Sequence, residues 1–407
     1  MSTPVGVRGA LWRAAVTPWG DVLVNDEPRL SWFIAADDRW YQPARETTVR
    51  QRLISDVPVI ETRVKVPGGD AVQRVYGVAN LGGLVVVEIY NDSSLPIAVA
   101  FDRGDIATMR APSPTGVKGI DLPPGSVVFP VGHHATMRVA IQVGDSTTSS
   151  TTIDLEALPG AEQVERGWIR VLQSTSRIDV PEHSWSTLLT TQRCGILLSQ
   201  PISNRNNLDD VEFVLDLAER VRLGDTAEQW ASDVAFATER IIERCSRNKI
   251  VEWDDERALL SASLLLNRAG EHRGRDDIAR VWARLAEPRV TREMPTRHET
   301  PATSARVIAW IESQLATLRR DGSVDICPRG IDKSWLGVNF ECFNLIATHE
   351  HLVSFAVRWH GERPALLWEI DGPPGVRVVS SALDSSFSST DKSGETLLRG
   401  WQSEPAK

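Results

Sequence analysis

The spacing of hydrophobic and polar positions changes twice along this 407-residue chain. Up to about residue 155, apolar and polar residues alternate in short runs, as in half-buried strands. From 156 to 322 the apolar residues recur every three or four positions, as in amphipathic helices, and from 323 to 407 they alternate again. The pattern predicts a multidomain α+β protein: an antiparallel β-sandwich domain (1–155), an α/α-hairpin domain (156–322) and a C-terminal β module (323–407).

The first block contains eight predicted strands, which are rich in Val, Ile, Phe or Trp and separated by Gly, Pro, Asn and Ser. Thr62, Val64 and Val66 share one face of a strand, while Arg63 and Lys65 share the other. The apolar run 84–87 predicts a central strand buried on both faces. Many short strands favour a sandwich of two antiparallel sheets. The predicted strands are 9–16, 29–35, 59–66, 72–78, 84–90, 96–101, 126–131 and 136–143. The polar run 146–152 is predicted to be a linker.

The middle block predicts a linker helix followed by six helices in three consecutive pairs with short connections. Gly224 and Gly270 are predicted helix stops, and Asp254 or Asp255 is the predicted cap of the helix that ends at Ala269. Leucines 259, 260 and 264–266 are expected to pack against Val281, Trp282 and Leu285. The predicted helices are 162–173, 182–198, 208–223, 227–245, 255–269, 276–286 and 304–320.

The tail predicts a β-hairpin or meander. Phe355, Val357 and Trp359 alternate with polar or small neighbours, and residues 365–370 form a second predicted strand. Turns at 361–364 and 372–375 connect these strands to a third at 376–380.

Charge and composition indicate which kinds of binding partner and which cellular compartment to expect. The net charge is −9, and no dense run of Lys and Arg is present, so a nucleic-acid partner is not expected. The N-terminus has no signal-peptide pattern, and no apolar run is long enough to cross a membrane. We therefore predict a cytoplasmic protein without a membrane partner. The four cysteines are far apart and predict reduced thiols, although the sequence leaves open whether Cys327 and Cys342 meet.

Tryptophan is unusually frequent, with 14 residues. An indole ring has a large apolar face that stacks well on sugar rings. The competing interpretation is that most of these side chains pack inside or between domains.

Residues 59–70 contain a predicted strand with Glu-Thr before a Gly-containing turn, and residues 88–101 contain a strand that ends in an Asn-rich turn. Both segments resemble the N-terminal β-supersandwich of six-hairpin glycosidases. Residues 167–181 are similar to the linker helix of those enzymes, and residues 354–369 to a C-terminal β module found beside their α/α toroid. The resemblance implies a carbohydrate-active scaffold.

One departure from that family affects the functional prediction. The family closes its toroid from six helical hairpins, whereas this sequence predicts three. A half-toroid exposes an apolar flank unless the β domains or a second chain cover it. A homodimer or a partner protein is therefore one expectation. The family's general acid and base cannot be assigned to particular residues here.

Carboxylates near tryptophans are the first candidates for chemistry, because a glycosidase needs two of them across the scissile bond. Asp254 follows Trp253 at a predicted helix start, where Asp255 and Glu256 also lie, and Glu341 follows Trp335 in the tail. Asp254 and Glu341 are the candidate catalytic residues, while Trp253 and Trp335 are candidate substrate-binding residues. The competing interpretations are a helix cap and a half-buried strand.

The densest polar-aromatic cluster lies around the predicted hairpin of the tail. Trp359, His360 and Arg363 are candidate substrate-binding residues there, with a purely structural hairpin as the alternative. Glu299, on a connection between helices, is a further candidate acid. His349 and His351 could share a face but lack a third ligand, so no metal is expected. No nucleotide-binding or acyl-transfer motif occurs, and no cofactor is expected.

Two main functional hypotheses follow. The favoured one is a carbohydrate-active scaffold that binds a glycan or a partner with reduced chemistry. The alternative is an intracellular glycoside hydrolase or phosphorylase that uses two carboxylates. A non-catalytic regulator or assembly subunit unrelated to carbohydrate is a third possibility.

Overall fold

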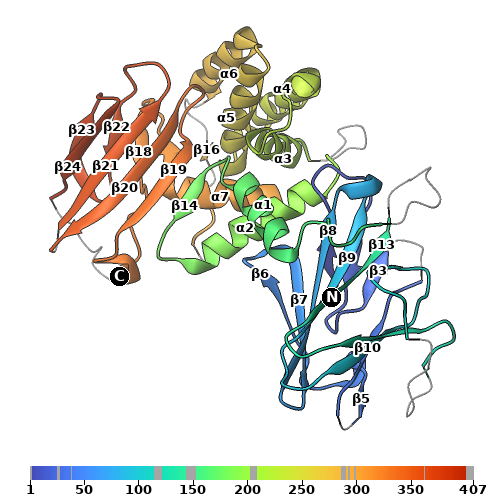
Figure 1. The fold of residues 1–407 in the computed structure, drawn as a ribbon. Helices are drawn as coiled ribbons and strands as arrows, with labels where there is room; N and C mark the ends of the chain where they lie inside the picture. Colours follow the sequence, from blue (N-terminus) through green and yellow to red (C-terminus); the bar gives the residue numbers. More distant parts are fainter. Residues whose placement is uncertain are drawn as a thin grey trace. The chain divides into compact units, whose positions relative to one another are not determined.

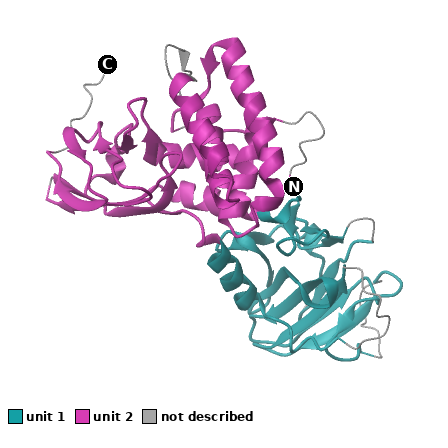
Figure 2. Cartoon of the chain, turned by 90° about the horizontal axis from the view of Figure 1, so that it is seen from above, with its two compact units in different colours: residues 1–171, 197–200 teal, residues 172–196, 201–407 magenta. Residues whose placement is uncertain are grey.

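The computed structural model describes residues 2–24, 28–37, 39–113, 122–143, 153–201, 209–285, 290–291, 294–297, 299–361 and 363–399. The chain forms two compact units (Figure 2). Unit 1 contains residues 1–171 and 197–200, and unit 2 contains 172–196 and 201–407. Within the described residues the fold is α+β, with antiparallel sheets and seven α-helices. The predicted linker 146–152 lies outside the described residues, and the division into three domains stays a prediction.

Unit 1 is built on a β-sandwich (Figure 1). A four-stranded sheet in the order β12-β10-β4-β5 packs against a six-stranded sheet in the order β11-β13-β9-β8-β7-β6, and apolar side chains of both sheets form one core. A small sheet, β1-β2-β3, contributes to the same core. The strands are β1 (Thr3–Val5), β2 (Ala14–Val16), β3 (Val22–Val24), β4 (Trp32–Ala35), β5 (Trp40–Tyr41), β6 (Arg50–Ile54), β7 (Val57–Val66), β8 (Gly69–Val78), β9 (Leu84–Asn91), β10 (Ile97–Phe101), β11 (Ala107–Thr108), β12 (Val127–Val131) and β13 (Thr136–Gln142).

The strands at the centre of the large sheet follow the predicted pattern. β9 lies between β8 and β13, and the run from Leu84 to Val87 is fully buried. On β7, Thr62, Val64 and Val66 are buried, while Lys65 on the opposite face is exposed. The alternation predicted these faces correctly because one side of the sheet packs on the sandwich core.

A ladder of alternating charge crosses the outer face of the six-stranded sheet. Arg52, Glu61, Arg74, Glu88 and Arg138 lie directly opposite one another on five successive strands. The Glu61 carboxylate accepts from the Arg52 and Arg74 Nε atoms at 3.0 and 3.1 Å, and Glu88 accepts from the Arg138 Nε at 2.9 Å. Burial would raise the pKa of Glu61, but its arginine partners lower that pKa below the ordinary value.

The helix α1 (Ala161–Leu172) is associated with unit 1 rather than with the helical bundle. Glu165 on this helix accepts a hydrogen bond of 2.5 Å from the Ser55 hydroxyl, which follows β6. Trp168 is buried. The hydrogen bond between Glu165 and Ser55 therefore connects the helix to the sandwich.

Unit 2 contains a helical bundle in which α3, α5 and α7 contact one another and α4 and α6 pack outside them. Three boundaries differ from the sequence prediction by four residues or more. The helix predicted at 276–286 begins at His272. The fourth helix begins at Ala231, after a short 3-10 turn at Glu228–Trp230, and the last one ends at Leu315 because the chain continues as a strand. The helices are α2 (His183–Leu198), α3 (Asp210–Arg222), α4 (Ala231–Asn248), α5 (Trp253–Arg268), α6 (His272–Leu285) and α7 (Ser304–Leu315).

Glycine ends two of these helices, as predicted. Gly224 and Gly270 have positive φ angles of 104° and 78°. After α3, the Asp225 N–H reaches back to the Arg220 carbonyl, and after α5 the Glu271 N–H reaches the Leu266 carbonyl. These six-residue bonds are those of a Schellman motif, which favours glycine because the left-handed conformation strains other residues.

The sequence predicts a β-hairpin or meander in the tail, and the C-terminal strands form two sheets. β20 and β21 form the predicted hairpin within the sheet β14-β19-β20-β21-β24. The third predicted strand, β22, instead joins the sheet β17-β18-β22-β23 and pairs in parallel with β18. Trp368 and Phe387 contact each other across the two sheets, with ring centroids 5.2 Å apart. The strands are β14 (Arg177–Asp179), β17 (Ala316–Leu318), β18 (Val324–Ile326), β19 (Phe340–Ile346), β20 (Leu352–His360), β21 (Arg363–Asp371), β22 (Val378–Ser380), β23 (Asp384–Ser389) and β24 (Ser393–Leu397), with a separate parallel pair β15 (Ile250–Val251) and β16 (Val290–Thr291).

The bundle and the C-terminal sheets share one apolar core. A chain of edge-on aromatic contacts runs from Trp310 on α7 through Trp185 on α2 to Trp335, then to Phe340 on β19 and Phe355 on β20, with centroid separations of 5.2–6.3 Å. The C-terminal strands thus pack against an apolar side of the helical bundle.

A buried ionic network also joins the bundle to the sheets. The Glu312 carboxylate of α7 accepts from Arg222 of α3 and Arg257 of α5, each at 2.9 Å. Glu219 of α3 accepts from Arg193 of α2 at 2.6 Å and from Arg222 at 3.0 Å. Arg222 and Arg257 donate further to the Asn344 and Ile346 carbonyls of β19. All five charged side chains are at most 5% exposed. Each of them needs an oppositely charged partner, because an unpaired buried charge would strongly destabilise the fold.

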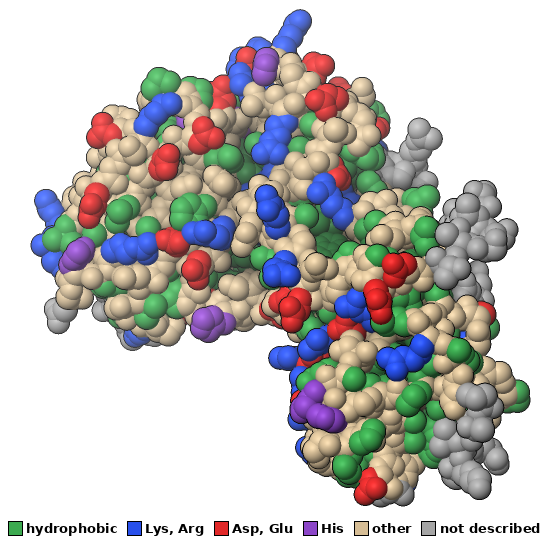
Figure 3. Space-filling view, viewed as in Figure 1, with side chains coloured by type: hydrophobic (Ala, Val, Ile, Leu, Met, Phe, Trp, Pro, Cys, Tyr) green, Lys and Arg blue, Asp and Glu red, His purple; other side chains and the backbone are tan. Residues whose placement is uncertain are grey.

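The surface is mixed in character. On the face shown in Figure 3, acidic and basic side chains are interspersed. The exposed large apolar side chains include Leu11, Phe236 and Val338, which come from separate segments. Among the described residues, no helix combines the length and the apolar character required to cross a membrane.

Candidate ligand-binding cleft in unit 2

A polar cleft lies where the first residues of α3, α5 and α7 meet the end of α4. Its volume is about 370 Å³, which falls in the range of small-molecule sites. Charged side chains dominate its lining. They are Asp209, Arg244, Glu252, Asp254, Asp255 and Arg306, with Val211, Asn248 and Ile250 as the uncharged members. Asp254, a predicted catalytic residue, therefore lies in a cleft with other carboxylates.

Arg306, near the start of α7, connects one wall of the cleft to another. Its Nε donates to Asp254 at 2.7 Å, and its Nη2 donates to Asp209 at 2.5 Å. Its Nη1 lies 3.3 Å from Glu212 of α3. Burial would lower the pKa of Arg306, but the contacts with Asp254 and Asp209 raise it above the ordinary value. Acceptors from α3 and α5 thus hold the guanidinium of Arg306, a residue of α7, in place.

The opposite wall is organised by Asp255. Its carboxylate pairs with Arg244 of α4 and accepts from the Glu252 backbone N–H at 2.9 Å and from the Cys245 thiol at 3.3 Å. Glu252, rather than Asp254 or Asp255, is the N-cap residue of α5, which corrects the predicted cap. Asp255 instead acts from the third position of the helix, where a carboxylate closes a capping box. Asp254 is left to face Arg306.

The cleft contains charged pairs rather than an isolated acid. Asp209, Asp254 and Asp255 each contact an arginine. Glu256 is the next residue of α5, and burial raises its pKa to about 7 against the opposing effect of Arg257 and Arg320. Glu256 is not among the residues that line the cleft. The cleft can accept and donate hydrogen bonds at closely spaced points.

Glu341, the other candidate catalytic residue, does not lie in this cleft. It is on β19, where Arg177 of β14 and Arg358 of β20 each donate to its carboxylate at 2.6 Å. Hydrogen bonding from Arg358 lowers the pKa of Glu341 below its ordinary value despite some desolvation. A lowered pKa suits a cross-strand ion pair, whereas a general acid requires a raised one.

The two tryptophans proposed beside these acids differ in accessibility. Trp335 is 1% exposed and lies within the aromatic chain between Trp185 and Phe340, so no ring face is open to a sugar. Trp253 is half-buried at the first position of α5 and packs against the shared core. Seven of the tryptophans are buried in the described residues, which fits the packing interpretation of their abundance. They are Trp12, Trp32, Trp168, Trp185, Trp310, Trp335 and Trp368.

The predicted hairpin is present, but the three candidate residues on it have different surroundings. His360 and Arg363 lie opposite each other at the end of the β20–β21 hairpin. Arg363 donates to the Leu398 carbonyl at 3.1 Å. Trp359 is half-buried and packs against the core on the side of Phe355 and Val357. The hairpin does not bring these three residues to Asp254 in the cleft, whose lining excludes them.

The remaining candidates have local partners. Glu299 is exposed and accepts from the Thr296 N–H at 3.0 Å, while the neighbouring residue His298 lies outside the described residues. His349 contacts the Ser263 hydroxyl at 2.8 Å, and His351 contacts Thr348 at 2.7 Å. Within the described part of the chain, no group of His, Cys, Asp and Glu side chains has the arrangement of a metal site. All four cysteines, including Cys327 and Cys342, are buried, and none of them forms a disulfide.

The sequence analysis missed four charged members of the cleft: Asp209, Arg244, Glu252 and Arg306. Their signal was present but ambiguous. Asp209 is the N-cap of α3, accepting from the Val211 N–H at 3.0 Å, and a cap is expected there whether or not it also lines a site. Arg244 and Arg306 are arginines on helices, where surface ion pairs are the ordinary role.

No protein-family model matches this chain, and the search of curated proteins found no match either.

Proposed function

We propose that unit 2 binds a glycan in the cleft at Asp254 and does not hydrolyse it. The observation that carries this proposal is the pairing of the cleft's carboxylates. Arg306 holds Asp209 and Asp254, and Arg244 holds Asp255. Neighbouring carboxylates and guanidinium groups supply the acceptors and donors that a polyhydroxylated ring requires.

Binding is favoured over hydrolysis because of what an acid catalyst needs. A glycosidase requires one protonated carboxyl group opposite one carboxylate. The carboxyl group with a pKa of about 7, Glu256, lies outside the lining of the cleft, and Glu341 lies in another sheet between two arginines. The half-toroid resemblance adds the expectation that the ligand is a carbohydrate.

The test is thermal stabilisation of the full chain by a panel of mono- and oligosaccharides. A ligand that binds only the native state raises the unfolding midpoint by mass action. We expect at least one sugar to raise it, and we expect Asp254→Asn to abolish that rise. Asp277→Asn, an exposed acid on α6 paired with Arg280, is the matched control and should retain the full shift.

Three results would count against the proposal. If no sugar in the panel raises the unfolding midpoint, glycan binding is ruled out. Release of free sugar from a bound oligosaccharide would establish hydrolysis in place of binding. A shift that Asp254→Asn leaves unchanged would assign the glycan to another surface.

A further inference from the structure

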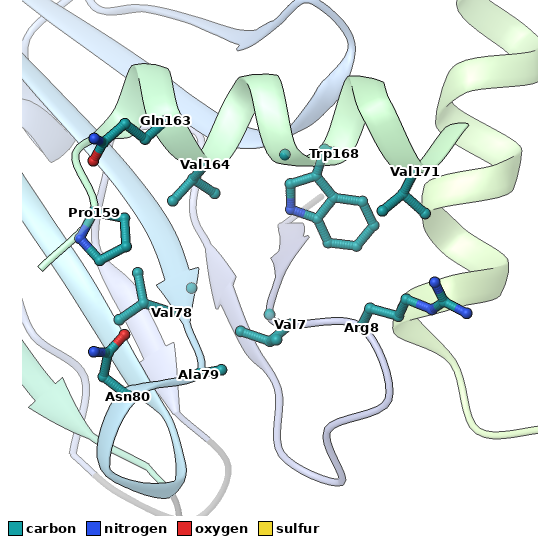
Figure 4. Close-up of a pocket in the computed structure, with 13 residues that line it drawn as sticks. Val7, Arg8, Val78, Ala79, Asn80, Pro159, Gln163, Val164, Trp168 and Val171 are labelled. Atoms are coloured by element: carbon teal, nitrogen blue, oxygen red, sulfur yellow. The ribbon is translucent and has the colours of Figure 1, made fainter. Parts of the chain in front are cut away.

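Unit 1 contains a second, chemically different cavity. It is a groove of about 390 Å³ between α1 and the segment that includes the end of β8 and residues 6–8 (Figure 4). Apolar side chains form most of its walls. Val164, Trp168 and Val171 line it from the helix, and Val7 and Val78 face them. At about 30 Å³ per water molecule, the space equals roughly a dozen waters, enough for a small organic molecule.

The groove is left open by small residues. Gly167 lies in the interior of α1 on the side that lines the groove, and a Cβ atom there would meet nothing within 4 Å. Glycine inside a helix is unfavourable compared with alanine, and no packing contact requires it at this position. Gly77 on the opposite side does have a packing reason, since a Cβ atom would approach the Gly6 carbonyl to 2.6 Å. Gly167 is thus the residue that keeps space free.

The charged lining of the groove is exclusively basic. Arg8 is the one charged residue among those that line it, and no acidic residue lines it. Figure 4 shows Arg8 near Val171 at one end, while Asn80 and Gln163 lie at the other. A guanidinium has five N–H donors and binds carboxylates through paired hydrogen bonds, so it can hold a further acceptor beside an existing one.

We propose that this groove binds a small amphipathic carboxylate, with its apolar body along Trp168 and its carboxylate at Arg8. Burial of an apolar chain against the valines supplies most of the affinity, because apolar area removed from water is favourable. The guanidinium supplies the preference for an anion. The groove is separate from the glycan cleft, and this proposal does not depend on that one.

Isothermal titration calorimetry of the full chain tests the proposal, with decanoate as the probe below its micelle-forming concentration. We expect decanoate to bind and decanol to bind about tenfold more weakly, since a charge-assisted hydrogen bond contributes at least that factor. Arg8→Gln should weaken decanoate binding by about tenfold and leave decanol binding unchanged.

Variants at Gly167 separate this groove from other surfaces. Gly167→Leu should abolish binding by filling the space, while Gly167→Ala, which adds one methyl group to a helix, should fold and retain binding. Arg166→Gln changes an exposed neighbour outside the lining and should bind as the wild type does. The proposal fails if the wild type binds no decanoate, if decanol binds as tightly, or if Gly167→Leu binds normally.

Discussion

Arg257 of α5 donates to the Glu312 carboxylate of α7 across 2.9 Å, and both side chains are at most 5% exposed. The same carboxylate is the acceptor for Arg222 and for the Ser176 hydroxyl. Burial would raise the pKa of Glu312, yet the surrounding arginines lower it to about 2. The carboxylate and the arginines therefore stay ionised in the centre of unit 2, because the attraction between opposite charges offsets the cost of burying them.

Glu312→Gln should be strongly destabilising. The substitution keeps the shape but leaves Arg222 and Arg257 without their shared anion, and breaking a buried pair costs about 3–5 kcal/mol. Urea unfolding measures this cost. Glu239→Gln on the exposed face of α4 is the control and should change the unfolding free energy by less than about 0.5 kcal/mol. An equally small change at Glu312 would contradict the role of the network.

Glu256 should make the protein less stable as the pH rises. Its folded pKa of about 7 exceeds the ordinary value of 4.5, so the folded state binds the extra proton between those values. The stabilisation is full below 4.5 and is lost as the pH passes through about 7. We expect a loss on the order of 2 kcal/mol over this window.

Glu256→Gln tests the assignment, because an uncharged amide removes the titration. Urea midpoints measured across that pH window should then be flatter than those of the wild type. Glu243→Gln, an exposed residue of α4, should keep the wild-type slope. An unchanged slope in Glu256→Gln would assign the pH dependence to other groups.

Glu341→Gln should have a small effect on stability and none on sugar binding. The carboxylate is 25% exposed between Arg177 and Arg358, and partly exposed ion pairs contribute less than about 1 kcal/mol. Because its pKa is lowered, this stabilisation is present at neutral pH and disappears on acidification through the folded pKa. Thermal shift with the sugar that binds the wild type is the measurement, and loss of that shift would return Glu341 to the site.

Glu61→Gln should destabilise the sandwich of unit 1 by about 1–3 kcal/mol, the usual range for buried hydrogen bonds to a charged group. The carboxylate is 1% exposed and accepts from Arg52, Arg63 and Arg74. Asp105→Asn, which disrupts an exposed pair with Arg103, is the control and should cost less than about 1 kcal/mol. Chemical denaturation measures the loss of unfolding free energy in both variants. Equal losses would contradict the prediction that the ladder contributes more than an ordinary surface ion pair.

Much of the secondary structure was predictable because its signals are local. The alternation in β7, the apolar run of β9 and the glycines after α3 and α5 each reflect a preference within a few neighbouring residues. The strand after α7 was missed because Ala316–Leu318 continues the apolar pattern of the helix, and its pairing partner Val324–Ile326 is what makes it a strand.

The candidate site was less predictable. Asp254 could be selected as an acid beside a tryptophan, but its partner Arg306 is 52 residues away in the sequence. The same local pattern also selected Glu341 and Trp335, which the structure places in an ion pair and in a buried aromatic chain.

The sequence by itself determined the order of the β, helical and β segments, the buried faces of the strands and the ends of several helices, because periodicity and turn chemistry act over short distances. Only the tertiary structure decided which arginine meets which carboxylate, which tryptophans are buried and where the cleft and the groove lie. Those features depend on contacts between residues distant in the chain, and a side chain's charge state and accessibility are set by the neighbours that folding brings to it.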